Sequence, residues 1–380
     1  MNRTTAPAPL STVFHDGYCW RLGGAPAHSR HVHAGETAAL SELPAAAEAW
    51  LAGHPGRWVV GVLAYEAAAL LHHTDCAHAP MTPLAVLHFY EHLPGAAVLP
   101  AAAQPFTLRE PFRHDWARPQ YLSAVEKIRA YLRAGDCYQV NLAQRFSSRY
   151  DGDSLNAWLR LQADHPAPHA SYFDYGEGQI FGVSPERFLA INGREILTEP
   201  IKGSRPRGID HAQDAQLARQ LLESNKDRAE NLMIVDLLRN DLGQLCRPGS
   251  ITAAPLFELR QFSNVQHLVS TVRGTLRDDV PPLAALLACF PGGSITGAPK
   301  RRAMQIIREL EPVARGFYCG SLFWQSADGR FDSSILIRTL QAHQGEIVCH
   351  GGGGIVYDSD PELEYAESIF KVEKLMAALG

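Results

Sequence analysis

The sequence predicts a globular protein that mixes α-helices and β-strands, because segments with helical and with strand periodicity alternate along the chain. Residues 118–134 carry apolar side chains at helical spacing. Residues 137–146 alternate apolar and polar side chains, which is typical of a strand with one polar face. The short runs 188–191 and 195–197 bracket a glycine and predict a β-hairpin.

Length and composition narrow the classes of function. At 380 residues the chain is long enough for one large domain or for two to three ordinary ones. It is 46% hydrophobic and 20% charged, which is typical of a globular protein. The net charge is −5 and lysine and arginine form no run, which argues against nucleic-acid binding. A small anionic substrate would need local positive groups instead.

The sequence predicts neither a secretion signal nor a membrane segment. Residues 1–11 are polar and lack an apolar signal core. The longest apolar run, 58–71, is interrupted by Glu66 and is too short to span a bilayer. The seven cysteines are odd in number and form no Cys-x-x-Cys pair, which indicates reduced thiols. We therefore expect a cytoplasmic protein that does not bind membranes.

The first part of the chain predicts strands but no recognisable site. Residues 58–65 and 84–90 predict two buried strands. Residues 98–107 are rich in alanine and proline and predict a connection. The helix over 118–134 follows, and Gly135 suits its C-terminal cap.

Four further elements are expected in the second half. Residues 225–242 predict a helix whose middle is buried, since it has little polar surface. Residues 261–272 predict a strand. Residues 291–300 predict a glycine loop that enters a helix, without the spacing of a nucleotide-binding loop. A strand is expected over 346–350, before the four glycines of 351–354.

An acid and an amine are expected to approach each other around the hairpin. Glu186 follows a Ser-Pro step, where proline holds the preceding residue extended. The hairpin would return Lys202, which precedes Gly203, toward Glu186. Such a pair can supply proton transfer and a nucleophile. On these residues alone, a surface loop with an ordinary salt bridge is the favoured interpretation.

Two pairs of carboxylates share helix faces. Asp227 and Glu230 are three residues apart, as are Glu364 and Glu367, in a helix that Asp360 is expected to cap. Each pair alone is typical of a solvated helix face. Two pairs on separate helices could instead meet around a hard cation such as Mg²⁺, which takes a few carboxylates and keeps waters.

Three features suit an anionic ligand. Arg338 is expected on a strand face with Leu336 and Leu340, where it could clamp a carboxylate or form a structural ion pair. The glycines of 351–354 let backbone N–H groups approach an anion, although glycine runs also form flexible turns. Lys371 lies one helical turn after Glu367 and could meet the same carboxylate.

Several of these segments, in their order along the chain, resemble the chorismate-utilising enzymes: anthranilate synthase component I, aminodeoxychorismate synthase component I, isochorismate synthase and salicylate synthase. The resemblance covers residues 118–380, including Ser-Pro-Glu-Arg-Phe at 184–188 and Pro-Ile-Lys-Gly-Ser at 200–204. It implies an α+β fold of two packed, mainly antiparallel β-sheets surrounded by helices. It also implies one interleaved unit, in which residues 1–108 contribute strands to the common sheets and residues 109–380 form the chorismate-binding catalytic region.

Two positions indicate a branch of this family. The Pro-Ile-Lys-Gly-Ser form is similar to aminodeoxychorismate synthases, since anthranilate synthases usually have alanine in place of Lys202. Isochorismate and salicylate synthases have a water-activating lysine in place of Gln139, which has no basic nitrogen. The resemblance thus implies amination of chorismate at C4 with loss of the C4 hydroxyl, giving 4-amino-4-deoxychorismate for p-aminobenzoate and folate synthesis. The alternatives are anthranilate synthase component I, which aminates C2, and a chorismate-binding protein without turnover.

The resemblance also implies residue roles. Lys202 is the expected nucleophile, Glu186 the acid and base, and His267 lies near the leaving hydroxyl. The expected cofactor is Mg²⁺, and its ligands are Glu230 and Glu367 directly and Asp227 and Glu364 mostly through water. The expected substrate contacts are Gln139, Ser204, Thr296, Tyr318, Arg338, Gly352, Gly353, Gly354 and Lys371.

The expected source of ammonia is a partner. No cysteine lies in a Gly-x-Cys-x-Gly nucleophile elbow, so the sequence predicts no glutaminase of its own. A separate glutamine amidotransferase subunit is therefore implied. No lyase sequence follows Gly380, so another enzyme is expected to release pyruvate and form p-aminobenzoate.

Overall fold

The computed structural model describes residues 10–74, 78, 80, 82–101, 104–261 and 265–380. The expected polar N-terminus lies outside the described residues up to position 9, as do 102–103 of the expected connection and 262–264 of the expected strand. In the described part of the chain, no helix is long and apolar enough to cross a membrane.

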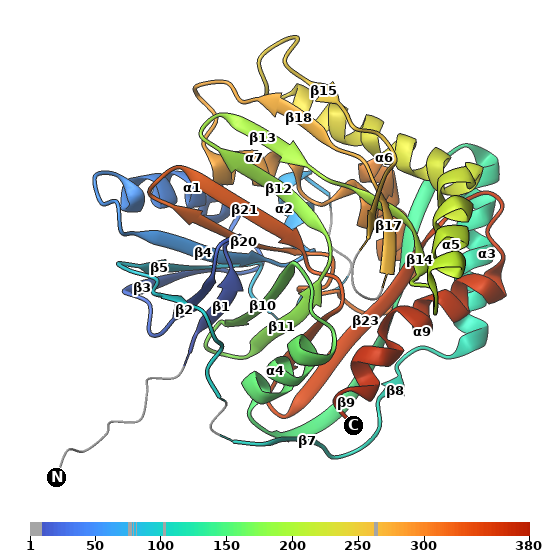
Figure 1. Ribbon diagram of the computed structural model, residues 1–380, viewed down its shortest axis with the longest axis horizontal. Helices are drawn as coiled ribbons and strands as arrows, with labels where there is room; N and C mark the ends of the chain where they lie inside the picture. Colours follow the sequence, from blue (N-terminus) through green and yellow to red (C-terminus); the bar gives the residue numbers. More distant parts are fainter. Residues whose placement is uncertain (1–9, 75–77, 79, 81, 102–103, 262–264) are drawn as a thin grey trace.

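The larger of two extended sheets has eleven strands, in the order β19-β9-β23-β22-β11-β10-β1-β2-β6, with β7 and β8 also paired to β9 (Figure 1). Its ladders are antiparallel, as between β9 and β23. Its strands are β1 (Thr12–His15), β2 (Trp20–Gly23), β6 (Gly95–Ala96), β7 (Phe106–Leu108), β8 (Arg113–His114), β9 (Gln139–Gly152), β10 (His169–Asp174), β11 (Gln179–Ser184), β19 (Gly297–Ala298), β22 (Thr339–His343) and β23 (Glu346–Ile355).

The second sheet has nine strands in the order β15-β18-β13-β12-β21-β20-β4-β5-β3, and a third, small sheet has the order β14-β17-β16. Strands from before residue 108 therefore lie in both large sheets. The second sheet contains β3 (His28–Val32), β4 (Trp58–Leu63), β5 (Ala85–Tyr90), β12 (Arg187–Asn192), β13 (Glu195–Thr198), β15 (Thr252–Ala253), β18 (Val272–Thr275), β20 (Ser321–Ser326) and β21 (Arg330–Ile335). The small sheet contains β14 (Ile201–Pro206), β16 (Glu258–Gln261) and β17 (Val265–Val269).

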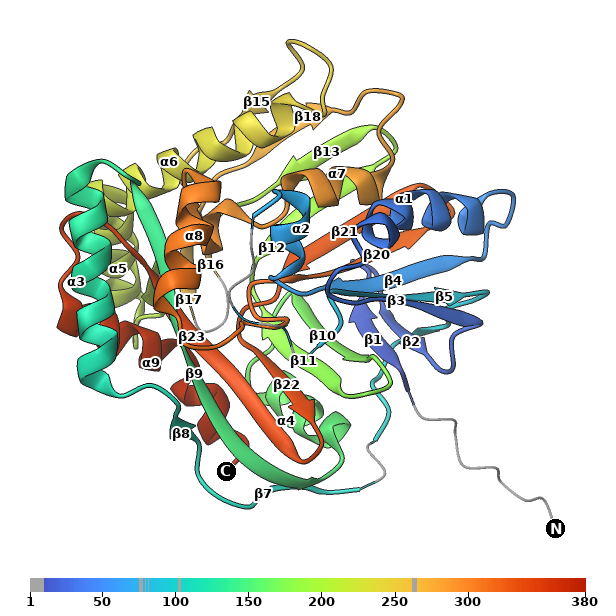
Figure 2. The ribbon, with the colours of Figure 1, turned by 180° about the vertical axis from the view of Figure 1, so that it is seen from behind.

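Helices cover the outside of the sheets, and α3, α5, α6 and α9 gather beside the small sheet (Figures 1 and 2). The helices are α1 (Thr37–Leu51), α2 (Ala67–Leu71), α3 (Arg118–Ala134), α4 (Ser154–Asp164), α5 (His211–Glu223), α6 (Asn225–Gly243), α7 (Pro282–Cys289), α8 (Lys300–Leu310) and α9 (Pro361–Ala377), with a 3₁₀ turn at Gly293–Ile295.

The two large sheets pack face to face over an apolar core. Phe14 of β1 and Trp324 of β20 belong to different sheets, and their rings stack with centroids 5.8 Å apart. Val60 of β4 and Phe173 of β10 lie in the same buried cluster. Burial of apolar surface of this kind is the main favourable contribution to folding. The predicted class, an α+β fold of two packed antiparallel sheets surrounded by helices, is confirmed.

Several predicted elements are present with the expected chemistry. Helix α3 begins and ends where its apolar spacing predicts, and Gly135 caps it with a φ of 79° that glycine adopts without strain. The hairpin of β12 and β13 pairs Ile191 with Ile196. Helix α9 begins after Asp360, whose carboxylate accepts hydrogen bonds from two backbone N–H groups of the first turn.

Three local predictions were wrong and a fourth was correct in part. Arg338 is not on a strand face, because it lies between β21 and β22 with a φ of 50°. The glycines 351–354 do not follow a strand but form the second half of β23. The expected strand over 261–272 is divided among three strands of two sheets, since the chain leaves the small sheet after β17. The predicted burial of the middle of α6 holds for Ile234, Val235 and Leu238, while Leu232 is 52% exposed.

Candidate active site

The small sheet carries three of the predicted site residues on adjacent strands. Lys202 and Ser204 lie on β14, and the register pairs Ser204 with His267 of β17. A bulge between Lys202 and Ser204 places Gly203 at a φ of 74°. A Cβ on Gly203 would lie 2.8 Å from Cγ of Asp227, so the glycine lets β14 approach α6. Helix α6 therefore presents its acidic residues beside Lys202.

Glu186 lies where the chain passes from one large sheet to the other, between β11 and β12. Its backbone carbonyl accepts a hydrogen bond from the Ile335 N–H (3.1 Å). Its N–H donates to Oγ of Ser184 (3.3 Å), and that hydroxyl donates to the Ile335 carbonyl (2.6 Å). These bonds fix the direction of the Glu186 side chain, which is buried.

Ser294 connects the predicted acid and the predicted nucleophile. The Ser294 hydroxyl donates to Oε1 of Glu186 at 2.8 Å, and Nζ of Lys202 donates to the Ser294 carbonyl at 3.2 Å. The structure thus brings Glu186 and Lys202 to one place through a residue of the glycine loop. Sequence reasoning named this loop but missed Ser294, because a serine beside glycines is also the ordinary composition of a turn.

Burial moves both ionisable groups toward their neutral forms. Burial raises the pKa of Glu186, although Lys202 and the Ser294 hydroxyl act in the opposite direction. Burial likewise lowers the pKa of Lys202, while Glu186 and Glu230 oppose this shift. A carboxylic acid that can donate a proton and an amine that can attack are therefore both favoured over their exposed counterparts.

One side of the site contains a neutral histidine, His267, and a positively charged arginine, Arg338. The imidazole Nδ1 of His267 is 2.7 Å from Oγ of Ser204. Burial and the nearby Arg338 lower the pKa of His267 to about 4, so this histidine is neutral at physiological pH. Within the described residues, no carboxylate pairs with the Arg338 guanidinium, whose pKa burial lowers. A half-buried cation without an anion fits a negatively charged ligand.

The four predicted metal-binding carboxylates lie around Lys202 and Lys371 without forming a ready-made cage. No group of three possible metal ligands was found in the part of the chain that the structure describes. Two of these carboxylates form ion pairs along their own helices. Oε1 of Glu367 is 2.7 Å from Nζ of Lys371. Oε1 of Glu230 is 3.9 Å from Nζ of Lys226. Asp227 is 3.3 Å from Arg205.

The acidic residues still influence one another electrically. Burial raises the pKa of Glu230, and Asp227 and Glu367 raise it further, although Lys202 opposes them. Burial and Glu367 raise the pKa of Glu364, whose Oε1 accepts from Ser359. The pKa of Glu367 is lowered, because Lys371 outweighs the effect of burial. Mutual repulsion of this kind is relieved when a cation binds between the carboxylates.

The glycines of β23 allow side chains to pack directly on the strand. A Cβ on Gly354 would lie 1.8 Å from Nε2 of Gln139, and one on Gly353 would lie 3.0 Å from Oε2 of Glu364. Nζ of Lys371 donates to the Gly352 carbonyl at 2.8 Å. Strand β22 pairs with β23 only as far as Cys349. The glycines that follow in β23 pair with β9 along one edge of the strand.

The remaining predicted contacts are buried near the same strand. Gln139 is 1% exposed, so its amide does not lie on a solvated edge. Thr296 is fully buried beside β9, where its carbonyl accepts from the Asn141 N–H at 2.9 Å. The Tyr318 ring stacks on His350 with centroids 4.9 Å apart, and sequence reasoning did not single out His350.

Comparisons with known proteins identify the family of the chain and proteins of similar sequence and fold. Residues 17–377 match the family described as chorismate binding enzyme. Aminodeoxychorismate synthase component 1 of Klebsiella aerogenes is 48% identical over 284 residues, 75% of this chain and 63% of that protein. The protein of the same name from Escherichia coli K12 is 47% identical over 274 residues, 72% of this chain and 60% of that protein. Anthranilate synthase component I from Streptococcus pneumoniae has a similar crystal structure, with a TM-score of 0.80 at 26% identity, covering 99% of this chain and 94% of that one.

The chain belongs to the chorismate binding enzyme family, since the family match extends over nearly its whole length. The relatives of higher identity are aminodeoxychorismate synthase chains, ahead of an anthranilate synthase component 1 from Geobacillus stearothermophilus at 42%. The chain spans about three fifths of the length of these aminodeoxychorismate synthases.

Proposed function

We propose that the chain aminates chorismate at C4, with loss of the C4 hydroxyl, and forms 4-amino-4-deoxychorismate for p-aminobenzoate and folate synthesis. The observation that carries this proposal is the arrangement of half-buried Lys202 with buried Ser294 and Glu186, in which an amine of lowered pKa lies beside an acid of raised pKa. The identity to aminodeoxychorismate synthases supports the same reaction.

In the proposed reaction, Nζ of Lys202 forms a bond to C2 of chorismate. The ring double bonds shift and the C4–O bond breaks, while Glu186 donates its proton to the departing hydroxyl, which leaves as water. Ammonia then bonds to C4, the double bonds shift back, and the C2–N bond to Lys202 breaks. Only a neutral lysine can attack, and burial of Lys202 favours that form.

The other predicted residues bind and orient the substrate. Arg338, Tyr318 and the backbone of Gly352 to Gly354 hold the enolpyruvyl carboxylate. His267, neutral and oriented by Ser204, lies near the leaving hydroxyl. The remaining proposed contacts are Gln139, Thr296 and Lys371.

The acidic residues fit Mg²⁺ as the cofactor. Glu230 and Glu367 would be its direct ligands, and Asp227 and Glu364 would act mostly through water. The fit rests on the crowding of buried Glu364 and half-buried Glu230 with other carboxylates, which raises the pKa of both. Mg²⁺ uses few protein carboxylates and keeps several waters, so a closed cage is not required. Bound there, it would neutralise the ring carboxylate of chorismate.

We also propose the setting of this activity. A separate glutamine amidotransferase subunit supplies ammonia, and the reaction takes place in the cytoplasm. The six described cysteines are free thiols, as that compartment favours, while Cys76 lies outside the described residues. Residues 109–380 form the catalytic region, and residues 1–108 complete its sheets.

The test is incubation of the protein with chorismate, Mg²⁺ and ammonium, followed by identification of the product by mass and retention time. 4-Amino-4-deoxychorismate is the expected product, and glutamine in place of ammonium is expected to give none. Anthranilate would indicate amination at C2 instead. Unchanged chorismate, with binding retained, would contradict turnover, and product formed from glutamine by the pure chain would contradict the need for a partner.

A further inference from the structure

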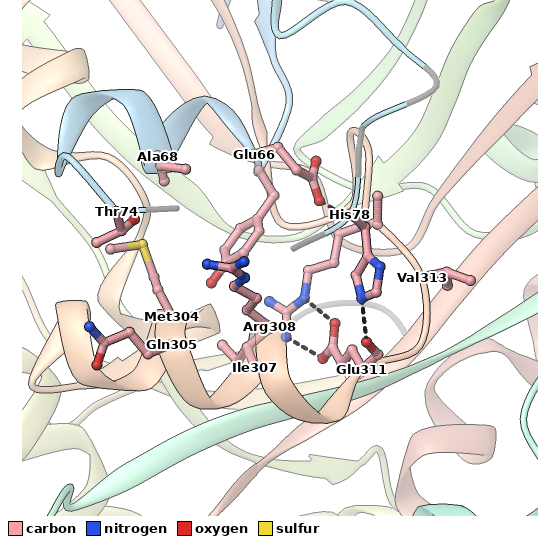
Figure 3. Close-up of a pocket in the computed structure, with 14 residues that line it drawn as sticks. Glu66, Ala68, Thr74, His78, Met304, Gln305, Ile307, Arg308, Glu311 and Val313 are labelled. Carbon is pink, nitrogen blue, oxygen red and sulfur yellow. Dashed lines mark hydrogen bonds and ion pairs between the residues drawn. The ribbon is translucent and has the colours of Figure 1, made fainter. Parts of the chain in front are cut away.

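A buried ion pair contacts the loop that carries Ser294. Arg315 is 2% exposed and Glu311 is 5% exposed. Nε of Arg315 donates to Oε2 of Glu311 at 2.8 Å, and Nη2 donates to Oε1 at 2.6 Å. Both residues line a cavity of about 60 Å³ between α2 and α8, where dashed lines mark the bonds to Glu311 (Figure 3).

The ion pair binds backbone groups at the edge of β9, beyond the point where β19 ends. Strand β19 pairs with β9 only at Gln139 and Val140. Beyond them, the carbonyl of Asn141 accepts from Nη2 of Arg315 at 2.9 Å. The N–H of Ala143 donates to Oε1 of Glu311 at 2.9 Å. Buried backbone groups need partners, and here two charged side chains take the place of a neighbouring strand.

The same guanidinium reaches the loop and the aromatic wall of the site. Nη1 of Arg315 donates to the carbonyl of Ile295, the residue after Ser294, at 3.1 Å. The Tyr318 N–H donates to the carbonyl of Arg315 at 3.2 Å. The guanidinium carbon lies 4.5 Å from the ring centroid of Tyr65 and 5.9 Å from that of Tyr318. One side chain therefore contacts the glycine loop, β9 and the Tyr318 turn.

We propose that Arg315 is a positioning residue, which fixes the loop so that Ser294 can hold Glu186 and Lys202 together; the inference rests on the function proposed above. The planar fork of an arginine can reach acceptors on three elements at once. A lysine offers one compact ammonium and cannot span them. Arg315→Lys should therefore loosen Ser294 while keeping a positive charge beside Glu311.

The chain offers a matched control in a different region. Arg21 donates from Nε to Asp16 at 2.8 Å and from Nη1 to the Leu93 carbonyl at 3.1 Å, and it lies over the Trp58 ring at 4.9 Å. This network contains the same kinds of partner as that of Arg315, namely a carboxylate, a backbone carbonyl and an aromatic ring. It lies on β2, toward the opposite end of the eleven-stranded sheet from β9. Arg21→Lys thus measures how the loss of an arginine network outside the site changes stability and kcat.

The experiment compares Arg315→Lys and Arg21→Lys with the wild type in ammonium-dependent amination, in melting temperature and across pH. For Arg315→Lys we expect kcat to fall at least tenfold, with a smaller change in KM for chorismate. The limb of the pH profile set by Glu186 should move to higher pH, because Glu186 loses the hydrogen bond that lowers its pKa. For Arg21→Lys we expect a lower melting temperature with kcat within twofold of wild type. Equal losses of kcat in both variants, or an unchanged kcat and pH limb in Arg315→Lys, would overturn the inference.

A readout without turnover separates this inference from the proposed function. Acetylation of Lys202 across pH, followed by mass spectrometry, reports the pKa of its amine. In Arg315→Lys the midpoint should move to lower pH, because the Ser294 carbonyl no longer stabilises the ammonium. If the wild type forms no product, the proposed function fails, and an unshifted midpoint would refute the role of Arg315. If Arg315→Lys does not fold, Glu311→Gln, which keeps the side-chain volume, is measured in the same way with the same criteria.

Discussion

Replacing Ser294 with alanine should move the pH dependence of amination to higher pH while leaving the fold intact. Ser294 is 8% exposed, and its hydroxyl donates to Oε1 of Glu186 at 2.8 Å. Lys202 bonds to the backbone carbonyl of Ser294, which alanine retains. The substitution therefore removes the hydrogen bond to Glu186 and no other bond of this network.

The size of the effect follows from the charge and burial of Glu186. A hydrogen bond to a charged group contributes about 1.5–3 kcal/mol. Since about 1.4 kcal/mol corresponds to a tenfold change in an ionisation equilibrium, the protonated form of Glu186 should gain roughly ten- to a hundredfold over the carboxylate. The hydroxyl stabilises the carboxylate, so its loss raises the pKa of Glu186 further, in the direction in which burial already acts.

The assay is ammonium-dependent formation of aminodeoxychorismate as a function of pH. Ser294→Ala should show the limb of the pH profile set by Glu186 moved to higher pH by roughly one to two units, because a general acid stays protonated up to its pKa. Ser294→Thr keeps the hydroxyl and should keep the limb of the wild type. Circular dichroism checks that both variants fold. A Ser294→Ala variant with the kcat and pH profile of the wild type would refute the proposed connection between Ser294 and Glu186.

Two further predictions concern carboxylates. Glu230→Gln and Glu367→Gln should each abolish turnover without unfolding the chain, and excess EDTA should silence the wild type; near-normal activity of either variant with Mg²⁺ would remove the proposed metal site. Glu66, far from these residues in sequence, has a pKa that burial raises from 4.5 to about 7, so the folded state binds more protons than the unfolded state between those values. Stability should therefore fall as pH rises through that window, by at most about 3 kcal/mol. Urea unfolding of Glu66→Gln should show its advantage over wild type growing between about pH 4 and pH 8, and an equal difference at both ends would contradict this shift.

The local predictions that are confirmed concern elements whose structure depends on residues close together in the sequence. The helix over 118–134 repeats its apolar residues on one face, and Gly135 ends it by a conformation available locally. The hairpin around Gly193 likewise depends on near neighbours, since Ile191 and Ile196 face each other across a short turn. The packing of the two sheets came from the family resemblance, because no local pattern specifies which strands pair over long separations.

The errors arise where tertiary contacts decide the backbone. Arg338 has the alternation of a strand residue, but the connection between β21 and β22 places it in the left-handed region. The glycines of 351–354 were expected to follow a strand, yet they lie within β23, where Gln139 and Glu364 pack directly on the strand. Neither constraint can be read from the residues next to it in the sequence.

The candidate site likewise contains residues that can be identified from the sequence and residues that can be identified only from the fold. Glu186 and Lys202 could be named from their motifs, and the structure places both against Ser294. Ser294 and Arg315 could not be named, because their importance depends on which atoms they reach: a carboxylate 108 residues away and carbonyls on two other elements. Hydrogen-bond partners of this kind are determined by the assembled fold rather than by residue type.

The proposed reaction depends most on Lys202 acting as a nucleophile rather than as a charge partner. The direct measurement is mass spectrometry of the Lys202 peptide after incubation with chorismate and Mg²⁺ but without ammonia. We expect a chorismate-derived adduct on Lys202 that is absent in Lys202→Ala, whose rate of amination should collapse. Lys202→Arg should also be inactive, because a guanidinium stays protonated and cannot attack. Wild-type rates of amination in Lys202→Ala, or retained activity in Lys202→Arg without any adduct, would contradict the covalent step.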